Sequence, residues 1–474
     1  MTWLILIAVP AAGALALAVP RLGRHPGVVV LTAGAITALV AGCLAVLPAS
    51  ALLLGGYLRG DDSAQLFAPV INFIFAGVAV NLRGRSATEQ ISRRFAFLAL
   101  AFLAASNLAL VCNQLLLMWV ALEVTTLAAA LMIARPGADA ARLASFRYFL
   151  FSSVGLGLAL LGLVCLTRSM EHAGRAATLF LHAMPAQVAG APDPWRQLGL
   201  GLVVLGIGTK LGLAPMYSWL PEAYDEAPAS VSALLGAVQF NCALLFLFRV
   251  VHVYRPGSGP LLTGILLVIG LASVAVSTAS IVATRNFKRL LAYAAINHAG
   301  VIAIGLGLGS TASYGLMLYV LSNAFIKAIL FLTAGKIEAH YGTRDTQAIS
   351  GLIKDLPFSG LFLMVGTFAL LGFPPFGSFL GELLILSALV TSGQMFVFAA
   401  FCVLITMSFV ATGRTIFPMI WGEPKQPRTW PAQRARSALH KLIFLGALLV
   451  LGIYIPPQLN GLIARVAQSL EGGP

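Results

Sequence analysis

Four formally charged residues lie deep inside long apolar stretches of this sequence: Glu123, Lys210, Lys327 and Glu382. A charged side chain at the centre of a bilayer costs about 2.5–3.5 kcal/mol on insertion scales unless it is paired or hydrated. Carboxylates and lysines that are partly removed from water can gain or release a proton. A buried Glu–Lys pair can also simply hold two helices together, but four such groups in four separate stretches favour proton handling.

Other polar residues share these apolar stretches. His298 follows Arg285 by thirteen residues, which places it near the expected membrane centre. A buried histidine there can carry a proton or can be a satisfied core residue. Tyr319 and Asn323 precede Lys327 by eight and four residues, so the three share one helix face and could hold a file of water.

Prolines interrupt two of the apolar stretches close to an ionisable residue. Lys210 lies five residues before Pro215 in "GTKLGLAPMYSWLPEAYDEAP", and Glu382 lies seven residues after Pro375 in "GFPPFGSFLGELLIL", where Pro374 also falls. Corresponding broken helices in the two halves of a chain are typical of inverted-repeat transporters. Unwound backbone is tolerated in a membrane only beside protein or water. We therefore expect water to reach the middle of the membrane at these breaks.

The composition indicates an all-α polytopic membrane protein. The 474 residues are 59% hydrophobic and 10% charged, where soluble proteins average about 25% charged. The mean hydropathy is +0.92. At roughly 30 residues for a span and its turn, the chain has room for about 14 spans. We expect them at residues 2–19, 27–47, 65–82, 95–112, 114–133, 146–166, 197–220, 228–250, 259–283, 287–308, 312–334, 359–390 (broken), 394–416 and 440–460.

The basic residues predict an orientation for these spans. Of 30 lysines and arginines, 21 fall in connections on one side, seven on the other, and Lys210 and Lys327 inside spans. Basic residues concentrate on the cytoplasmic side, so both termini are expected outside the cytoplasm. The net charge of +14 then follows from topology, and no nucleic-acid partner is expected. The basic loop 417–439 is predicted to be cytoplasmic, where it contacts a partner or anionic headgroups or is simply solvated.

No cofactor or metal site is expected from the cysteines. None forms a CxxC or Cys/His pair, and all lie in apolar stretches, which is typical of buried small side chains: Cys43, Cys112, Cys165, Cys242 and Cys402. The first apolar stretch lacks a basic residue before it and has Arg21 and Arg24 after it, which favours an uncleaved first helix.

Five stretches carry a resemblance to a known family: "MWVALEVTTLAAALM", "GTKLGLAPMYSWLPEAYDEAPASVSALL", "RNFKRLLAYAAINHAG", "NAFIKAILFLTAG" and "GFPPFGSFLGELLIL". Over about 95–420 the chain resembles the antiporter-like membrane subunits of respiratory complex I, of multisubunit Na+/H+ antiporters and of group 4 membrane-bound hydrogenases. Two segments, "MWVALEVTTLA" and "LPEAYDEAPASVSALL", are most similar to the component F type of hydrogenase-4.

The resemblance implies a fold and a domain order. It implies 14 core helices, with helices 4–8 and 9–13 forming two inverted five-helix repeats and with helices 7 and 12 broken. On this sequence the units are expected at 1–94 for helices 1–3, 95–250 for the first repeat, 251–416 for the second, and 417–474 for the basic loop and helix 14.

The resemblance also implies roles by position. Glu123 matches the helix-5 glutamate, Lys210 the helix-7 lysine that pairs with it, and Lys327 the central helix-11 lysine. Glu382 matches the terminal helix-12 acid, and His298 matches a helix-10 histidine of some members.

The chain departs from the family pattern at several positions. Asn241 stands near the helix-8 lysine or histidine of many members, and Tyr319 and Asn323 stand where some carry helix-11 histidines. The family's usual Asp-Ala-His is here Glu222, Ala223, Tyr224. Asn241 cannot store a proton, although it can hydrogen-bond water. We therefore expect either water between Lys210 and Lys327 or weak pumping. The chain ends soon after the last predicted span, so a long lateral helix like that of one complex I subunit is not expected.

These observations predict a proton-translocating subunit of a multi-subunit energy-converting complex in a bacterial inner membrane. Its partners would be other subunits, the lipid bilayer, and protons or Na+. It would have no catalytic centre of its own, and any electrons would pass through other subunits of an oxidoreductase. Two alternatives stay open: a membrane subunit of a cation/proton antiporter or of a proton-coupled inorganic-carbon uptake complex, and a purely structural membrane anchor.

Overall fold

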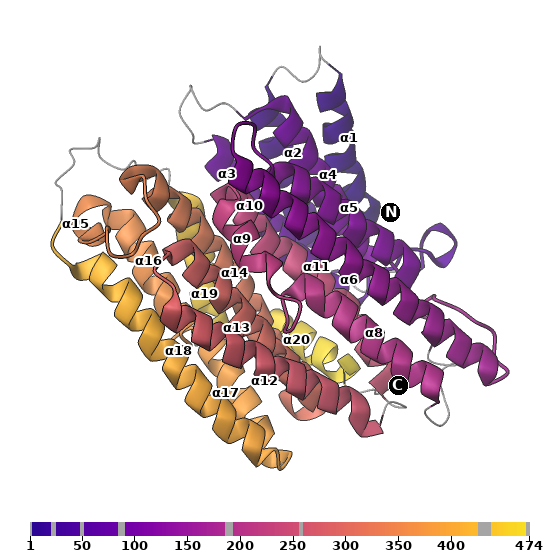
Figure 1. Cartoon of the computed structure of the whole chain (residues 1–474). Helices are drawn as coiled ribbons and strands as arrows, with labels where there is room; N and C mark the ends of the chain where they lie inside the picture. The colour runs from indigo at the N-terminus through magenta and orange to yellow at the C-terminus, as the bar shows by residue number, and fades with distance from the viewer. Residues whose placement is uncertain are drawn as a thin grey trace.

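The protein is a bundle of long helices that run side by side, with α1 and α2 at one edge and α18 at the opposite edge (Figure 1). The computed structural model describes residues 2–19, 25–47, 52–83, 91–184, 193–255, 259–424 and 438–470. Within these ranges there are isolated β-bridges but no β-strand. The expected all-α polytopic fold is confirmed. Arg21, Arg24, Arg85 and residues 425–437 of the basic loop lie outside the described residues.

Ten of the described helical segments are long and apolar enough to cross a membrane. They are α2 (Pro26–Leu44), α3 (Asp62–Arg83), α4 (Arg93–Val111), α5 (Leu115–Ile133), α6 (Asp139–His172), the joined α10 (Ala229–Ala233), η2 (Leu234–Gln239) and α11 (Phe240–Tyr254), α12 (Gly259–Ala283), α13 (Phe287–Leu308), α14 (Ser310–Tyr341) and α18 (Met395–Trp421). The shorter α1 (Thr2–Ala18) is also apolar. The expected total of 14 spans therefore stays a prediction.

Two apolar stretches are broken, and each break holds the expected prolines. The first separates α8 (Pro194–Leu211) from α9 (Trp219–Glu226), and the second separates α16 (Pro357–Leu370) from α17 (Gly377–Thr391). Gly212 and Gly372 lie directly after or near the first helix of each pair, with φ of +78° and +67°. Glycine adopts this left-handed backbone without a Cβ penalty, which lets the helix end there.

The two predicted repeats contain the same order of elements. Of the described residues, 95–250 hold α4, α5, α6, the broken α8–α9 and α10–α11. Apart from the four-residue α15 (Leu352–Asp355), residues 251–416 hold α12, α13, α14, the broken α16–α17 and α18. Each half therefore has three continuous helices, one broken helix and one further helix. The inverted relation of the halves and the domain boundaries stay predictions.

Facing glycines bring the third and fourth helices of each half into close contact. A Cβ added to Gly206 of α8 would lie 2.5 Å from the Gly155 carbonyl oxygen of α6. In the second half, a Cβ on Gly381 of α17 would lie 2.6 Å from the Gly315 carbonyl oxygen of α14. Small residues allow such backbone approach between membrane helices, where dispersion forces must supply the association. These contacts fix the helices that carry Lys210 and Glu382.

The expectation of one span over 440–460 is wrong in its second half. α19 (Leu439–Ile453) ends before Pro456 and Pro457, and the chain bends by 73° into α20 (Pro457–Leu470). Leu462, Ile463 and Val466 are buried on one side of α20, which packs on α3, α11 and α14. Proline at N1 starts a helix well but cannot continue one, so the Pro-Pro pair starts a separate amphipathic helix.

Candidate functional site

Lys210 lies at the end of α8 and is 4% exposed. Its Nζ donates a hydrogen bond to Thr126 Oγ1 of α5. Glu123, one turn earlier on α5, accepts a 2.7 Å hydrogen bond from Ser153 Oγ of α6, and its Oε2 has no hydrogen-bond partner among the described residues. The implied Glu123–Lys210 pair is therefore not in direct contact: no ion pair within 4.0 Å joins the two side chains.

Lys327 lies midway along α14 and is 2% exposed. Its Nζ lies 3.7 Å from the centroid of the Phe240 ring and has no hydrogen-bond partner among the described residues. The side chain packs on Gly236, where an added Cβ would lie 3.4 Å from Lys327 Cδ. Gly236 belongs to η2, a π-helical turn, and such turns are frequent at functional sites. Face contact with an aromatic ring stabilises a buried ammonium without neutralising it.

A hydrogen-bonded cluster of polar side chains that was not predicted adjoins the contacts of both lysines. Gln239, the last residue of η2, donates a 3.1 Å hydrogen bond to Thr125 Oγ1 and accepts a 2.9 Å bond from the Tyr148 hydroxyl. Thr125 is adjacent in sequence to Thr126, which holds Lys210, and Gln239 is adjacent to Phe240, which contacts Lys327. The available signal was the presence of threonine and glutamine inside the apolar runs "LEVTTLA" and "AVQFNC".

Asn241 and Asn323 have weaker connections. Asn241 Nδ2 donates a 2.6 Å hydrogen bond to the Ala237 carbonyl of its own helix, and its Oδ1 has no partner within the described part of the chain. Asn323 Oδ1 is likewise buried without a described partner. A buried acceptor without a donor loses its hydrogen bonds to water and gains none from the protein, which costs free energy. Both oxygens are therefore suitable acceptors for an ordered water.

His298, Tyr319 and Glu382 meet at one small cavity. The Tyr319 hydroxyl and His298 Nδ1 are 2.8 Å apart, and the two rings stack with centroids 5.3 Å apart. The cavity, of about 20 Å³, is also lined by Glu382, Asn297 and Thr412, among others, and is large enough for about one water. An added Cβ on Gly372 would lie 2.7 Å from Glu382 Oε2, so this glycine makes room for the carboxylate beside the break.

The sequence of the chain matches a known family of membrane proteins. Residues 112–408 match the family model described as NADH:quinone oxidoreductase/Mrp antiporter, transmembrane. The chain belongs to this family. The match covers more than half of the chain, and it confirms the resemblance to the antiporter-like membrane subunits.

Individual relatives agree with the family assignment. The chain is 33% identical over 376 residues to the hydrogenase-4 component F homolog of Methylacidiphilum infernorum, covering 76% of this chain and 75% of that protein. It superposes with a TM-score of 0.87 and 23% identity on a chain of the archaeal membrane-bound sulfane sulfur reductase, covering 99% and 97%. A chain of the Mrp complex from Dietzia sp. gives a TM-score of 0.86 at 20% identity, with the same coverages. The protein thus has the fold of an antiporter-like membrane subunit.

An ion-pair network at one end of this antiporter-like subunit was also missed. Asp225 of α9 is buried and contacts Arg289 at 2.8 Å and Arg344 at 3.0 Å. Lys288 donates to the Asp225 carbonyl at 2.6 Å and forms a 3.0 Å ion pair with Glu338. Burial opposes the charge of Arg344, but Glu338, Asp225 and Glu226 outweigh it and raise the pKa of its guanidinium above the ordinary value. The network ties α9 to α13 and to the end of α14.

Two lysines that were expected in loops are buried instead. Lys288 lies in the first turn of α13 and Lys441 in the first turn of α19, each 1% exposed. Lys441 Nζ donates a 3.3 Å hydrogen bond to Thr333 of α14 and lies 5.0 Å from the centroid of the Phe362 ring. The expectation that Lys288 and Lys441 lie in loops is therefore wrong, because local hydropathy does not show what packs against a helix end.

Proposed function

We propose that this chain translocates protons across a membrane as the antiporter-like subunit of a multi-subunit energy-converting complex. The observation that carries the proposal is that two buried lysines, Lys210 and Lys327, each contact a residue adjacent in the chain to one hydrogen-bonded cluster of polar side chains from three helices. Burying an ammonium inside a membrane protein costs free energy, so ionisable residues are rare in membrane helices and commonly mark proton paths.

The Glu123 carboxylate would control whether Lys210 holds or releases its proton. A carboxylate close to the ammonium favours its charged form, and a more distant carboxylate favours release of the proton. In this structure the Glu123 carboxylate is engaged by Ser153 and Lys210 is engaged by Thr126. A side-chain rotation of Glu123 would change its separation from Lys210, and a neighbouring subunit or charge could drive that rotation.

The proton would then pass from Lys210 to Lys327. Lys210 Nζ becomes a neutral amine as it gives a proton to water, and the neutral amine of Lys327 takes a proton from the same file of water. Gln239 and Asn241 do not titrate, so their amides would orient this water. The His298–Tyr319 pair and Glu382 would form the onward section, with Glu382 exchanging protons with the far side.

The surroundings of the subunit are proposed in the same terms. The 33% identical relative is named as a hydrogenase-4 component, and this supports a hydrogenase-like or complex I-like assembly of several subunits. We place the subunit in a bacterial inner membrane, and the excess of basic residues in one set of connections supports an orientation with both termini outside the cytoplasm. In a cation/proton antiporter or an inorganic-carbon uptake complex the same axis would serve, and the coupled subunit would decide the outcome.

Proton movement in reconstituted vesicles tests the proposal. The complex is purified through this chain, reconstituted, and energised through its partner subunits while a pH-sensitive dye reports the lumen. Lys210→Ala and Lys327→Ala should each reduce proton uptake at least 10-fold, while Lys354→Ala, which removes an exposed lysine, should leave it unchanged. If both buried-lysine variants assemble normally and pump at the wild-type rate, the proposal is wrong.

A further inference from the structure

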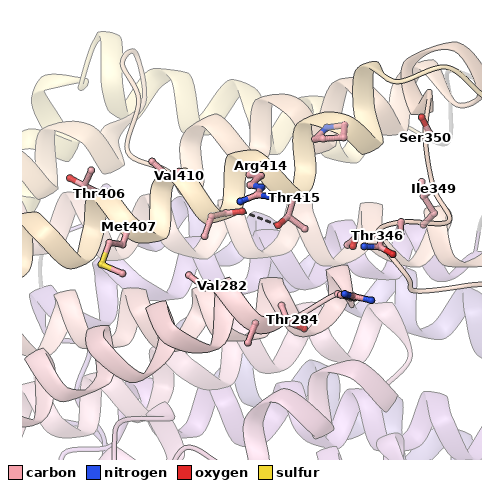
Figure 2. Close-up of a pocket in the computed structure, with 15 residues that line it drawn as sticks. Val282, Thr284, Thr346, Ile349, Ser350, Thr406, Met407, Val410, Arg414 and Thr415 are labelled. Atoms are coloured by element: carbon pink, nitrogen blue, oxygen red, sulfur yellow. Dashed lines mark hydrogen bonds between the residues drawn. The ribbon is translucent and has the colours of Figure 1, made fainter.

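A groove on the outside of the bundle is separate from the buried axis. It lies between the end of α12, the connection that follows α14, and the second half of α18, and its volume is about 920 Å³ (Figure 2). Figure 2 shows Val282 on one wall facing Met407 and Val410 on the other, with Thr346 and Ser350 toward one end. The groove is therefore apolar along one part and polar along the rest.

The apolar part consists of side chains left open on the outer face. Val282 is 60% exposed, Met407 49% and Val410 58%. α18 is one of the least covered helices, which is consistent with a face that contacts lipid. Exposed large side chains on a membrane helix are suitable neighbours for acyl chains.

The polar part carries two arginines and no acid. Arg285 and Arg414 both line the groove and are exposed, and neither forms a side-chain hydrogen bond or ion pair with another described residue. None of the described lining residues is Asp or Glu. The nearby Arg289 and Arg344 by contrast each form an ion pair with Asp225. The described lining of the groove thus has two positive charges and no negative one, which favours an anion.

The length of α18 allows Arg414 to lie at the level of a lipid headgroup. Arg414 follows Met395, the first residue of α18, by 19 residues, which corresponds to about 28 Å along a helix. The hydrocarbon core of a bilayer is about 30 Å thick. If Met395 lies at one boundary of this core, Arg414 therefore lies near the opposite boundary. Trp421, exposed at the end of α18, is the residue type enriched at the membrane–water interface.

We propose that this groove binds one anionic glycerophospholipid. Its phosphate group would contact the guanidinium groups of Arg285 and Arg414, and its acyl chains would lie along Val282, Met407 and Val410. Basic pockets between membrane helices on the cytoplasmic side bind anionic headgroups by this combination of charge and apolar contact. The site lies outside the proposed proton path, so its occupancy is a property additional to translocation.

The test uses the intact complex in detergent and a phosphatidylglycerol that carries a photoreactive diazirine in its acyl chain. Cross-linked peptides are identified by mass spectrometry. We expect labelling of α12 and α18 that unlabelled phosphatidylglycerol displaces, and that neither phosphatidylcholine nor soluble glycerol phosphate displaces. Arg285→Gln with Arg414→Gln should weaken binding about 25-fold, since each basic residue near the surface contributes roughly 5-fold.

Matched variants distinguish binding in the groove from nonspecific attraction of the lipid to positive charge. Arg93→Gln with Arg94→Gln removes two exposed charges from the start of α4 and should leave labelling unchanged. Arg285→Lys with Arg414→Lys keeps the charge and should retain most of the binding. Three results would overturn the proposal: no label on α12 or α18 in the wild type, equal displacement by phosphatidylcholine, or a partner subunit cross-linked across the groove in the assembled complex.

Discussion

The Nζ of Lys327 lies 3.7 Å from the centroid of the Phe240 ring, and it has no hydrogen-bond partner among the described residues. The ring is thus the described group that most directly stabilises the ammonium form of a buried lysine. A cation–π contact contributes about 0.5–2 kcal/mol, more when it is desolvated. Phe240 therefore connects the packing of the π-helical turn with the charge state of Lys327.

Phe240→Leu should impair proton translocation by about 2- to 30-fold, which corresponds to the loss of that cation–π energy. The matched control is Phe246→Leu, which removes a fully buried ring from the same helix but leaves Lys327 untouched. Both variants should lose similar thermal stability in detergent, but vesicle assays should show a selective loss for Phe240→Leu. Equal rates for the two variants would mean that the ring does not act on Lys327.

Thr126→Val should disable Lys210 without disrupting the fold. The substitution keeps the side-chain volume but removes the hydroxyl that accepts the Lys210 hydrogen bond. Hydrogen bonds to charged groups contribute about 1.5–3 kcal/mol, so translocation should fall by roughly 10- to 150-fold. Thr126→Ser retains the acceptor and should restore most of the rate. A Val variant as active as the Ser variant would exclude a role for this bond.

Gly372→Ala should displace the Glu382 carboxylate. Residue 372 has φ of +67°, and the new methyl group would lie 2.7 Å from Glu382 Oε2. Gly393→Ala is the matched control, because its φ is +70° and nothing lies within 4 Å of the added methyl. Both variants should lose about 1–2 kcal/mol from backbone strain, as measured by thermal unfolding. Only Gly372→Ala should also lose proton translocation. Equal translocation rates for Gly372→Ala and Gly393→Ala would show that translocation does not depend on where the Glu382 carboxylate lies.

Asp225→Asn should destabilise the protein by weakening the contacts of α9 with α13 and with the end of α14. Removing one partner of a buried ion-pair network typically costs about 3–5 kcal/mol, and Arg289 and Arg344 would lose their shared carboxylate. Asp139→Asn, which removes an exposed acid paired with Arg142, should change stability by less than about 1 kcal/mol. Unfolding temperatures in detergent give the comparison. A wild-type unfolding temperature for Asp225→Asn would show that the network does not hold α9.

Helix breaks were predictable because their causes are local. Proline removes a backbone donor, and at both breaks a glycine three residues before Pro215 or Pro375 can adopt a positive φ. Proline alone does not break a helix here, because Pro10, Pro69 and Pro418 lie inside continuous helices. The start of α20 was locally signalled as well, by Pro456 and Pro457, but the apolar residues after them resembled the tail of a span. The packing of one face of α20 on α3 and α14 made it a separate helix.

The sequence by itself determined the membrane class, the two broken stretches and the scarce titratable residues, because hydropathy and backbone chemistry act residue by residue. Only the tertiary structure decided which group each of these residues contacts. Lys210 donates a hydrogen bond to Thr126, Glu123 accepts one from Ser153, and Lys327 contacts the Phe240 ring. Lys288 and Lys441 are buried at helix ends. Such contacts join positions 30 to more than 100 residues apart, so they depend on how helices are oriented and packed, which no local pattern encodes.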